Sequence, residues 1–541
     1  MLVSSNSYDD LRQRFSWLIP EFYNIGVDAC DRHADGSGRL ALIYVDEAHR
    51  CRRFTFDDLR TLSNQFANVL EAHGLGRGDR IGVLLPQAPE TAIAHLAAFK
   101  AGLISVPLFT LFGEQALEFR LADSGAKAVV TDAPGLAKLR SIVDRLPALE
   151  RIYVVGRADG SEGLGNRVAT FETEIERAAG SFTPVMTRAD DPALIIYTSG
   201  TTGNPKGALH AHRVLLGHLP GVELSHDFLP QPGDLCWTPA DWAWIGGLLD
   251  VLMPAWHHGV PVLAHRARKF DPDFAMWLMA EYNVRNVFLP PTALKLMREV
   301  KARHAGVRLR TVASGGESLG VELLDWGRET FGLSINEFYG QTECNMVVSN
   351  DSCLFPVRPG SMGRAVPGHR LYIINESGEL LPFGEVGCIG VLRPDPVMFL
   401  EYWQNPTGTA QKYAGEYLTT GDLARQDEDG YFAFVGRSDD LITSAGYRIG
   451  PSEIENCLIS HPAVSMAAVV GVPDRIRTEV VKAWLVLKPG YKPSEELVRD
   501  IQDHVRTHLG AHEYPRHIAF IDALPMTATG KIMRRVLRER G

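Results

Sequence analysis

Paired cysteines, long apolar runs and an excess of positive charge are all missing from this sequence, and each absence excludes a class of protein. The seven cysteines among 541 residues are scattered and never stand in CxxC spacing, which argues against a disulfide framework or a zinc site. No apolar run reaches the roughly 18 residues that a membrane-spanning helix requires, since the best candidate, residues 246–256, is interrupted by Asp250. The net charge of −10 disfavours binding to nucleic acid.

Targeting features are missing from the N-terminus as well. Asp9 and Asp10 stand beside Arg12 and Arg14, without the apolar stretch of a signal peptide. Together with the missing disulfide pattern, this predicts a soluble protein of the cytoplasm with no integral membrane association. Internal repeats and low-complexity tracts are absent too.

What is present is the composition of a large globular enzyme, with 45% hydrophobic and 22% charged residues. A chain of 541 residues is too long for one hydrophobic core, so two to four domains are expected. Residues 55–74 have helical spacing, with Thr55 and Asp58 as a capping pair. Helical stretches then alternate with apolar strands at residues 81–85, 103–107, 128–131 and 152–155. This alternation is typical of parallel sheets covered on both faces.

Two segments depart from that rhythm. Residues 156–180 are polar and rich in glycine without a repeating period, which predicts a surface excursion. Near residue 430 the pattern of apolar segments changes. From there on, short apolar strands alternate with helices at residues 454–460 and 496–509. The C-terminal part is therefore expected to form a small α+β domain of its own.

A loop rich in hydroxyl groups and glycine follows the apolar strand at residues 193–196, and a helical pattern begins after it at Val214. Its members are Thr198, Ser199, Gly200, Thr201, Thr202, Gly203, Lys206 and Gly207. Glycines let successive N–H groups converge, hydroxyls add donors and a lysine adds a point charge, which together suit a polyphosphate. The spacing is not that of P-loop NTPases, because Lys206 follows Pro205 rather than glycine. A surface loop without a ligand could have the same composition.

The loop resembles the signature of the adenylate-forming superfamily, which includes acyl-CoA synthetases, luciferases and the adenylation domains of peptide synthetases. Later stretches match that family in the same order, so the resemblance covers nearly the whole chain. They are Tyr339-Gly-Gln-Thr-Glu343, Gly421-Asp422, Gly436-Arg437, Ser444-Ala-Gly-Tyr-Arg448 and Gly530-Lys531.

The resemblance implies an α/β fold with a large N-terminal domain of stacked mixed and parallel sheets with flanking helices, and a small mobile α+β domain. The expected boundaries are residues 1–436 for the AMP-binding domain, 437–440 for a hinge that turns about Asp439, and 441–541 for the C-terminal domain. It also implies an ATP-dependent acyl-CoA synthetase that needs ATP, Mg²⁺ and CoA. A carboxylate is a poor electrophile, so it is first joined to the α-phosphate of ATP with loss of pyrophosphate and then passed to a thiol.

The resemblance assigns roles to particular residues. The loop from Thr198 to Lys206 would hold the β- and γ-phosphates. Thr342 would bond the α-phosphate and Glu343 would carry Mg²⁺, with Thr202 as a second metal contact. Lys531 would reach the α-phosphate and the acyl oxygens during adenylation. The remaining nucleotide contacts are expected at Gly316, Glu317, Ser318, Glu337, Tyr339 (against adenine), Gly340, Gln341, Asp422 (on the ribose diol) and Arg437.

For the second half-reaction the small domain would turn, so that Lys531 leaves and another face arrives. On that face Gly446 would allow close approach of pantetheine and Arg448 would supply a cation, while Arg506 is a further candidate for a CoA phosphate. The sequence does not decide the oligomeric state. A homo-oligomer, and acylation of Lys531 by a lysine acyltransferase that switches the enzyme off, are kept as hypotheses.

The acyl pocket is expected around a tryptophan-rich segment, residues 236–247, whose alternative interpretation is simply core. By resemblance Trp244, Ile245 and Gly246 would line the pocket, with Gly315 and Gly340 opposite. Acetate enzymes close the pocket with a tryptophan at the position of Gly340, so a glycine predicts a larger acid, short- to medium-chain or compact cyclic or branched. Gly340→Trp would then shift the preference towards acetate. Cys344-Asn345 stand where many relatives have Thr-Gly.

Three alternatives remain open. Gly316-Glu-Ser-Leu-Gly320 fits the nucleophile elbow of an α/β-hydrolase, with Ser318 as nucleophile and His369 or His461 as base. An adenylating enzyme that loads a carrier-protein thiol would share every ATP motif. A catalytically dead nucleotide-binding module is disfavoured, because Glu343 and Lys531 are both present.

Overall fold

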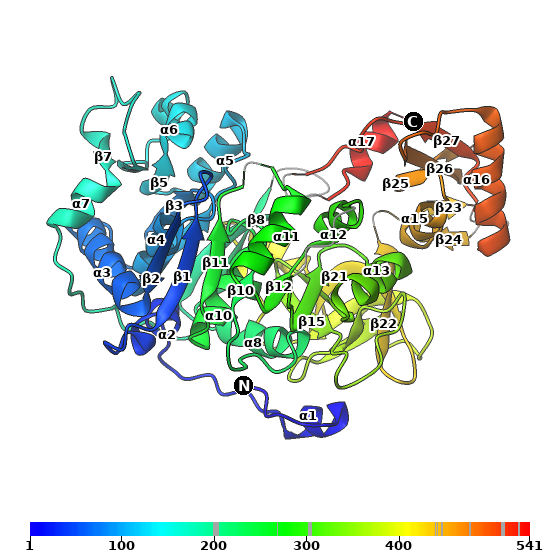
Figure 1. Ribbon diagram of the computed structural model, residues 1–541, viewed down its shortest axis with the longest axis horizontal. Helices are drawn as coiled ribbons and strands as arrows, with labels where there is room; N and C mark the ends of the chain where they lie inside the picture. The colour runs from blue at the N-terminus through cyan, green and yellow to red at the C-terminus, as the bar shows by residue number, and fades with distance from the viewer. Residues whose placement is uncertain are drawn as a thin grey trace.

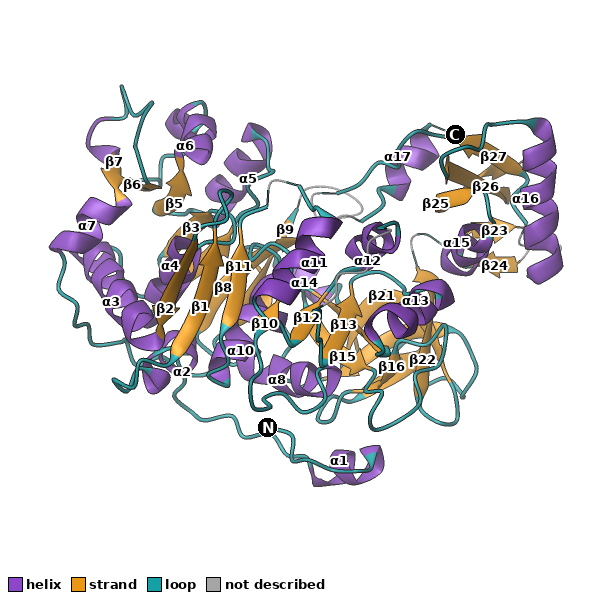
Figure 2. Ribbon diagram, in the orientation of Figure 1, coloured by secondary structure: helices purple, strands orange, loops and turns teal. Residues whose placement is uncertain are grey.

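The described residues form three sheets, two large and one small (Figure 1 and Figure 2). The structure is a computed structural model that describes residues 1–198, 205–267, 269–300, 306–438, 440, 442–444, 447–474, 478–509, 514–527 and 531–540. Among these, the side chains of residues 443, 447, 448, 453 and 478 are not described.

The eight-stranded sheet has the order β19-β9-β8-β4-β3-β5-β6-β7. Strands β3 to β8 are parallel, and β9 and β19 join antiparallel at one edge. The strands are β3 (Arg80–Leu84), β4 (Ile104–Pro107), β5 (Ala128–Asp132), β6 (Arg151–Val155), β7 (Val168–Thr170), β8 (Pro192–Thr198), β9 (Lys206–Ala211) and β19 (Glu401–Tyr402). The helices between them are α3 (Phe56–Ala72), α4 (Pro89–Lys100), α5 (Glu114–Ser124), α6 (Ala133–Arg140) and α7 (Phe171–Arg177).

The fourteen-stranded sheet has a parallel part and an antiparallel part. Strands β1 (Leu40–Val45), β11 (Val262–His265), β10 (Cys236–Trp237), β12 (Asn286–Phe288), β13 (Thr311–Gly315) and β14 (Ile335–Gln341) are parallel neighbours. The antiparallel members are β2 (Cys51–Thr55), β15 (Cys344–Ser349), β16 (Gly363–Ala365), β17 (Leu371–Ile374), β18 (Gly387–Leu392), β20 (Tyr413–Ala414), β21 (Tyr417–Gln426) and β22 (Tyr431–Arg437).

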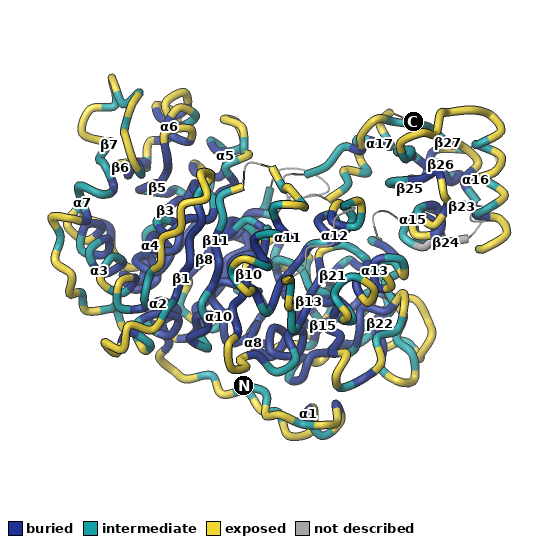
Figure 3. The backbone as a smooth tube through the Cα atoms, in the orientation of Figure 1, coloured by how far each residue is buried: buried dark blue, intermediate teal, exposed yellow. Residues whose placement is uncertain are grey.

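The remaining helices before the small sheet pack against one of the two large sheets or against other helices. The long ones are α8 (Val214–Ser225), α11 (Pro272–Glu281), α12 (Pro291–Arg298) and α13 (Val321–Phe331). Shorter ones are α1 (Tyr8–Arg14), α2 (Ile25–Ala29), α9 (Ile245–Gly247), α10 (Met253–His257) and α14 (Pro406–Ala410). Helix α8 is buried along its whole length, as the tube coloured by burial also shows (Figure 3).

The small sheet belongs to the C-terminal part of the chain. It contains β23 (Ile442–Ser444), β24 (Tyr447–Ile449), β25 (Val464–Asp474), β26 (Thr478–Leu487) and β27 (His517–Phe520). Three helices accompany it: α15 (Pro451–Ser460), α16 (Glu495–His508) and α17 (Arg534–Glu539). Strand β22 of the large sheet ends at Arg437 and β23 of the small sheet begins at Ile442, so the change of sheet falls within five residues.

Local chemistry explains the start of α3. The Thr55 side chain accepts from the Asp58 N–H, and the Asp58 carboxylate accepts from the Thr55 N–H in return. This capping box satisfies two of the donors that every helix N-terminus leaves open. The predicted capping pair is therefore confirmed.

Two expectations from the sequence need correction. The segment at residues 156–180 is more than a surface excursion, since it contains β7 and α7, and α7 buries Phe171 and Ile175. The phosphate-type loop does not lead directly into a helix: it returns as β9, which pairs with β8, before α8 begins. Among the described helices, none is both long enough and apolar enough to cross a membrane.

Candidate active site

The predicted phosphate loop connects the two strands of the β8–β9 hairpin. Ser199, Gly200, Thr201, Thr202 and Gly203 lie outside the described residues, so their predicted contacts stay predictions. The two ends of the loop are described: the Thr198 hydroxyl donates to the carbonyl of Lys206 at 3.3 Å. Antiparallel pairing of Thr198 with Lys206 closes the loop and fixes where the lysine leaves the sheet.

The second predicted motif forms the turn between β14 and β15. Thr342 and Glu343 are the two turn residues, which places a hydroxyl and a carboxylate side by side at the end of the hairpin. Glu343 is 7% exposed, and its carbonyl accepts from the N–H of Phe399 at 2.9 Å. The chain from Phe399 continues into β19, so Glu343 lies where the two large sheets meet.

Tyr402 connects these two motifs. Its hydroxyl donates to Glu343 Oε1, and its ring centroid lies 5.1 Å from Lys206 Nζ. A buried carboxylate and a lysine that were 137 residues apart in sequence are thereby brought to either side of one tyrosine. Sequence reasoning missed Tyr402, because its partners lie far away along the chain. The aromatic residues Phe399, Tyr402 and Trp403, close together in the sequence, were the available signal.

A second polar cluster surrounds Asp422. Its Oδ2 accepts from the Tyr339 hydroxyl and from Gln341 Nε2, each at 2.6 Å. Arg437 NH1 lies 3.4 Å from Oδ1. Burial and the adjacent Asp422 carboxylate both raise the pKa of Tyr339, so this phenol stays protonated and donates. The structure thus brings together Tyr339, Gln341, Asp422 and Arg437, which are four of the predicted nucleotide contacts.

Lys412 extends the same cluster and was not foreseen. Its ammonium group lies 3.2 Å from Gln341 Oε1 and 3.3 Å from the carbonyl of Thr420. By fixing the amide oxygen of Gln341, the lysine turns the amide nitrogen towards Asp422.

The segment after β13 also lies at this end of the sheet. Gly316 has φ +97°, a conformation that side chains rarely adopt, and a Cβ there would lie 3.3 Å from the Trp244 ring. Glu317 Oε2 lies 3.8 Å from Lys295 Nζ. Leu319, just after Ser318, donates its N–H to Glu337 Oε1 at 3.3 Å. Burial raises the pKa of Glu337 to about 8. The carboxyl is therefore neutral at pH 7, and in that form it accepts the hydrogen bond from Leu319.

Aromatic rings form a wall next to the same segment. Trp244 and Phe288 lie 5.6 Å apart between ring centroids, and Phe288 and Phe338 lie 5.1 Å apart. A Cβ at Gly246 would meet the Trp244 ring at 2.8 Å, and a Cβ at Gly315 would meet the Phe338 ring at 2.6 Å. Ile245 is buried beside them. The glycines predicted for the acyl pocket therefore allow these rings to approach the backbone.

Gly340 does not leave open space, contrary to the expectation from the sequence. A Cβ on Gly340 would lie 2.3 Å from the backbone nitrogen of Met346 and 2.4 Å from Asn345 Oδ1. Asn345 is itself fixed, since its amide donates to both carboxylate oxygens of Asp250 at 2.8 and 3.0 Å. A tryptophan at position 340 would collide with β15 rather than simply narrow the pocket. Asn345, one of the two positions where this chain departs from many relatives, supplies part of that obstruction.

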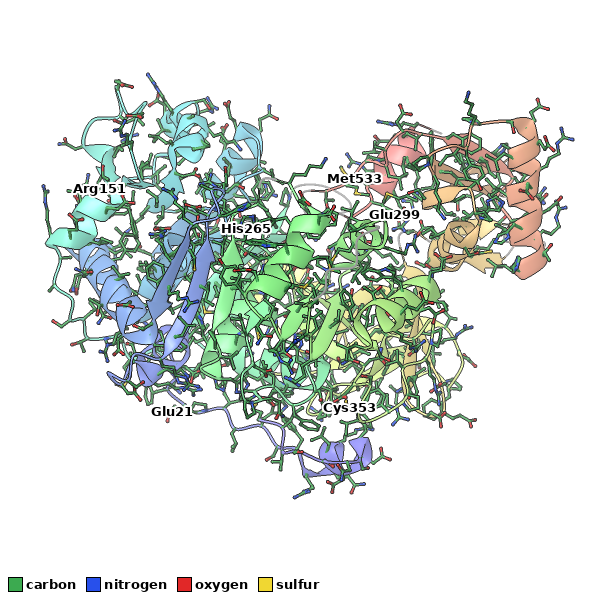
Figure 4. All side chains as sticks on the ribbon, viewed as in Figure 1. Glu21, Arg151, His265, Glu299, Cys353 and Met533 are labelled. Atoms are coloured by element: carbon green, nitrogen blue, oxygen red, sulfur yellow. The ribbon has the colours of Figure 1, made fainter. Side chains whose placement is uncertain are left out.

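Lys531 lies in a turn of the C-terminal domain that is closed by a bridge between Met526 and Ile532. The Lys531 N–H donates to the Thr527 hydroxyl at 3.1 Å, and the side chain is exposed. Figure 4 labels Met533, two residues further on, on the segment that leads into α17. No contact of Lys531 with the nucleotide residues is described, so its reach to the α-phosphate stays a prediction.

The remaining predicted residues of the small domain are only partly covered. Asp439 and Gly446 lie outside the described residues, as does the side chain of Arg448. Arg506 NH1 pairs with Asp503 at 2.9 Å, and its guanidinium lies 4.4 Å from the Tyr514 ring centroid. The hinge and the CoA contacts therefore stay predictions.

The donor set fits a magnesium ion. Glu343 offers a hard carboxylate oxygen, and a single carboxylate plus phosphate oxygens is the ligand set that Mg²⁺ accepts readily in nucleotide sites. The Tyr402 hydroxyl holds Oε1, which leaves Oε2 for the ion.

Comparison with known proteins agrees with this geometry. The family model described as AMP-binding enzyme matches residues 30–403, and the one described as AMP-binding enzyme C-terminal domain matches residues 453–531. A mitochondrial acyl-coenzyme A synthetase of Mus musculus is 35% identical over 99% of this chain and 93% of its own length. An acetyl-coenzyme A synthetase of Bacillus subtilis is 34% identical over 98% of this chain and 94% of its own.

Solved structures show the same likeness. An anthranilate CoA ligase in complex with anthranoyl-AMP superposes with a TM-score of 0.88 at 30% identity, covering 96% of this chain and 98% of that one. An acyl-CoA synthetase of Brucella canis reaches a TM-score of 0.76 at 35% identity, covering 99% and 98%.

Fold and site therefore define an adenylate-forming enzyme, and the chain belongs to the AMP-binding enzyme family. Within that family it is an acyl-CoA synthetase, an acid–thiol ligase that uses ATP, Mg²⁺ and CoA. The hydrolase alternative is set aside, because the matching family models and relatives are AMP-binding enzymes and acyl-CoA synthetases.

Proposed function

We propose that this ligase activates a short- to medium-chain or compact cyclic or branched acid, with the roles divided between two clusters. The junction of Lys206, Tyr402 and Glu343 holds the triphosphate end of ATP, and the Asp422 cluster holds the nucleoside end. The observation that carries this division is the contact of both Lys206 and Glu343 with Tyr402.

Each side chain has a task that follows from its charge. Lys206 is a cation for the β- and γ-phosphates, and the Thr342 hydroxyl donates to the α-phosphate. Asp422 accepts from the two ribose hydroxyls through the oxygen that Arg437 faces. When bound, Mg²⁺ supplies positive charge that offsets the developing charge on the phosphates. Catalysis is then a matter of holding the carboxylate in line with the α-phosphorus.

The acid class rests on the aromatic wall of Trp244, Phe288 and Phe338. The three neighbouring rings, tilted by 37° and 49° against one another, give an apolar boundary suited to a ring or a short alkyl chain. The match to an enzyme solved with a compact aromatic adenylate supports the same size range.

The small domain supplies the second half of the reaction in this proposal. A turn about residues 437–440 withdraws Lys531 and brings Gly446 and Arg448 towards the acyl-adenylate, and Arg506 is a further CoA contact. The large domain then comprises residues 1–436 and the small one residues 441–541. A location in the cytoplasm, a homo-oligomeric state and acylation of Lys531 by a lysine acyltransferase belong to the proposal too. The exposure of the Lys531 side chain supports the last of these.

Pyrophosphate release over a panel of acids tests the proposal. The panel runs from acetate to decanoate and adds benzoate and branched acids, each with and without CoA. Sustained release only with CoA, and fastest with acids larger than propionate, is the expected result. Equal turnover with a carrier-protein thiol in place of CoA would favour the alternative acceptor, and a preference for acetate would overturn the size class. Mass spectrometry of protein from its source tests acylation, because Lys531 found always unmodified would contradict it.

A further inference from the structure

Three potential metal ligands meet between two helices of the small domain. Cys457 comes from α15, and His504 and His508 come from α16. One ligand atom from each residue lies within 4.8 Å of the other two. Helix α16 lies at the outer edge of the small domain, away from the large sheets (Figure 1), so this cluster is separate from the nucleotide site.

The spacing on α16 places both imidazoles on one face. Residues four apart in a helix are neighbours on its surface, and a pair of histidines at that spacing is a recurring way to bind a transition metal. Here the two ring centroids lie 4.2 Å apart.

Hydrogen bonds fix the tautomer of each ring. His508 Nδ1 lies 2.8 Å from the carbonyl of His504, and a carbonyl only accepts, so Nδ1 carries the proton and Nε2 keeps its lone pair. The Ser460 hydroxyl donates its single proton to the carbonyl of Cys457 at 2.7 Å. It must therefore accept from His504 Nε2 at 2.9 Å, which leaves the lone pair on His504 Nδ1.

That arrangement is the one found around bound metals, where the second nitrogen of each ligating histidine donates to a neighbouring oxygen. Cys457 is a reduced thiol that is 9% exposed.

His461 is close to the cluster but is already occupied. Its Nδ1 accepts from the Ala463 N–H at 3.2 Å, and its Nε2 faces Asp500 at 3.1 Å. The described residues thus supply three ligands. His504 and His508 also line a groove of about 480 Å³.

We propose that Cys457, His504 and His508 bind one Zn²⁺ ion, with water from the groove as the fourth ligand. Two imidazoles and one thiolate form a ligand set of the borderline softness that zinc selects. On binding, the Cys457 thiol releases its proton to solvent and the thiolate takes its place in the ligand sphere. The ion would link α15 to α16 and so stabilise the small domain. The lack of CxxC spacing argued against a zinc site in the sequence. That argument does not apply here, because the three ligands come from two different helices.

Zinc affinity of the untagged full-length protein tests the site, by competition with a chromophoric chelator. The wild type should bind one equivalent. Ser460→Ala removes only the partner of His504 and should weaken binding about 10- to 100-fold. His508→Ala removes a ligand and should weaken it further. His517→Ala is the matched control, since His517 is an exposed histidine of the same domain, and it should bind like the wild type.

A second readout covers the cysteine. Co²⁺ bound through a thiolate gives a sulfur-to-cobalt charge-transfer band, which should be present in the wild type and absent in Cys457→Ser. If Cys457→Ser fails to fold, the zinc affinity of His508→Ala still tests the site. His508 is exposed, so its replacement should leave the fold intact. Equal zinc affinity of His508→Ala and wild type, or no binding by the wild type at micromolar zinc, would overturn the proposal.

Discussion

Tyr402→Phe should raise the Mg²⁺ concentration needed for adenylation, and the structure sets the size of the effect. The substitution removes one hydroxyl, whose hydrogen bond to Glu343 Oε1 is made to a charged acceptor inside the protein. Such a bond contributes about 1.5–3 kcal/mol. Since about 1.4 kcal/mol corresponds to a factor of ten, half-saturation by Mg²⁺ should move up about 10- to 150-fold.

The physical reason is orientation of the carboxylate. With the hydroxyl present, Oε1 is held and Oε2 remains for the ion. Without it, the side chain rotates freely, and a metal ligand that has lost its outer partner binds more weakly. The phenylalanine ring still fills the space beside Lys206, so packing is kept.

Pyrophosphate release at saturating ATP and acid, titrated with Mg²⁺, measures the shift. Tyr372→Phe on β17, at the far edge of the fourteen-stranded sheet, is the control and should leave the Mg²⁺ titration unchanged. An unchanged titration for Tyr402→Phe would refute the positioning role. A lower Mg²⁺ requirement would mean instead that the hydroxyl competes with the ion.

Four other substitutions have defined outcomes. Lys531→Ala should abolish acyl-adenylate formation and largely spare thioester formation from supplied adenylate, measured as two separate half-reactions; equal loss of both would contradict its assigned role. Gly340→Ala should lower activity towards every acid and reduce thermal stability, because the new Cβ would lie 2.3 Å from Met346 N; a stable variant that merely prefers acetate would restore the original pocket argument. Glu337→Gln should gain stability relative to wild type as pH rises from about 5 to 8. The folded-state pKa of Glu337 is raised from 4.5 to about 8, so its contribution is present at low pH and is lost as the pH rises, by at most about 1.4 kcal/mol per pH unit; parallel stability curves in urea at each pH would count against it. Lys100→Ala should cost about 3–5 kcal/mol of unfolding free energy, since it strips Asp31, Ser63 and Asn64 of a fully buried ammonium group; a loss below about 1 kcal/mol in chemical denaturation would show that the ion pair contributes little.

Elements with a strong local signal could be predicted from the sequence. Helix α3, residues 56–72, falls within the predicted residues 55–74, and its capping box forms as expected. Strand β9 and helix α7 were missed. Strand β9 follows directly after a glycine-rich loop, and α7 has only seven residues, so both depend on packing against neighbours more than on their own periodicity.

The active site divides in the same way. The nucleotide motifs could be recognised because each is a short run whose residue types serve its chemistry. Lys412 could not, since it meets Gln341 across 71 residues of sequence. Glu337 was expected at the nucleotide. Its side chain is buried, and its carboxyl accepts a hydrogen bond from the Leu319 N–H. Whether a side chain faces a ligand or the core depends on which way the strand's register turns it.

By itself the sequence determined the family, the adenylating chemistry, the need for ATP, Mg²⁺ and CoA, and the residue types that could serve it. Only the tertiary structure decided that Tyr402 contacts both Lys206 and Glu343, that Gly340 is packed against β15, and that Cys457 meets two histidines of α16. The reason is that residue chemistry is a local property, whereas contacts between distant residues arise only when sheets and helices pack in one register.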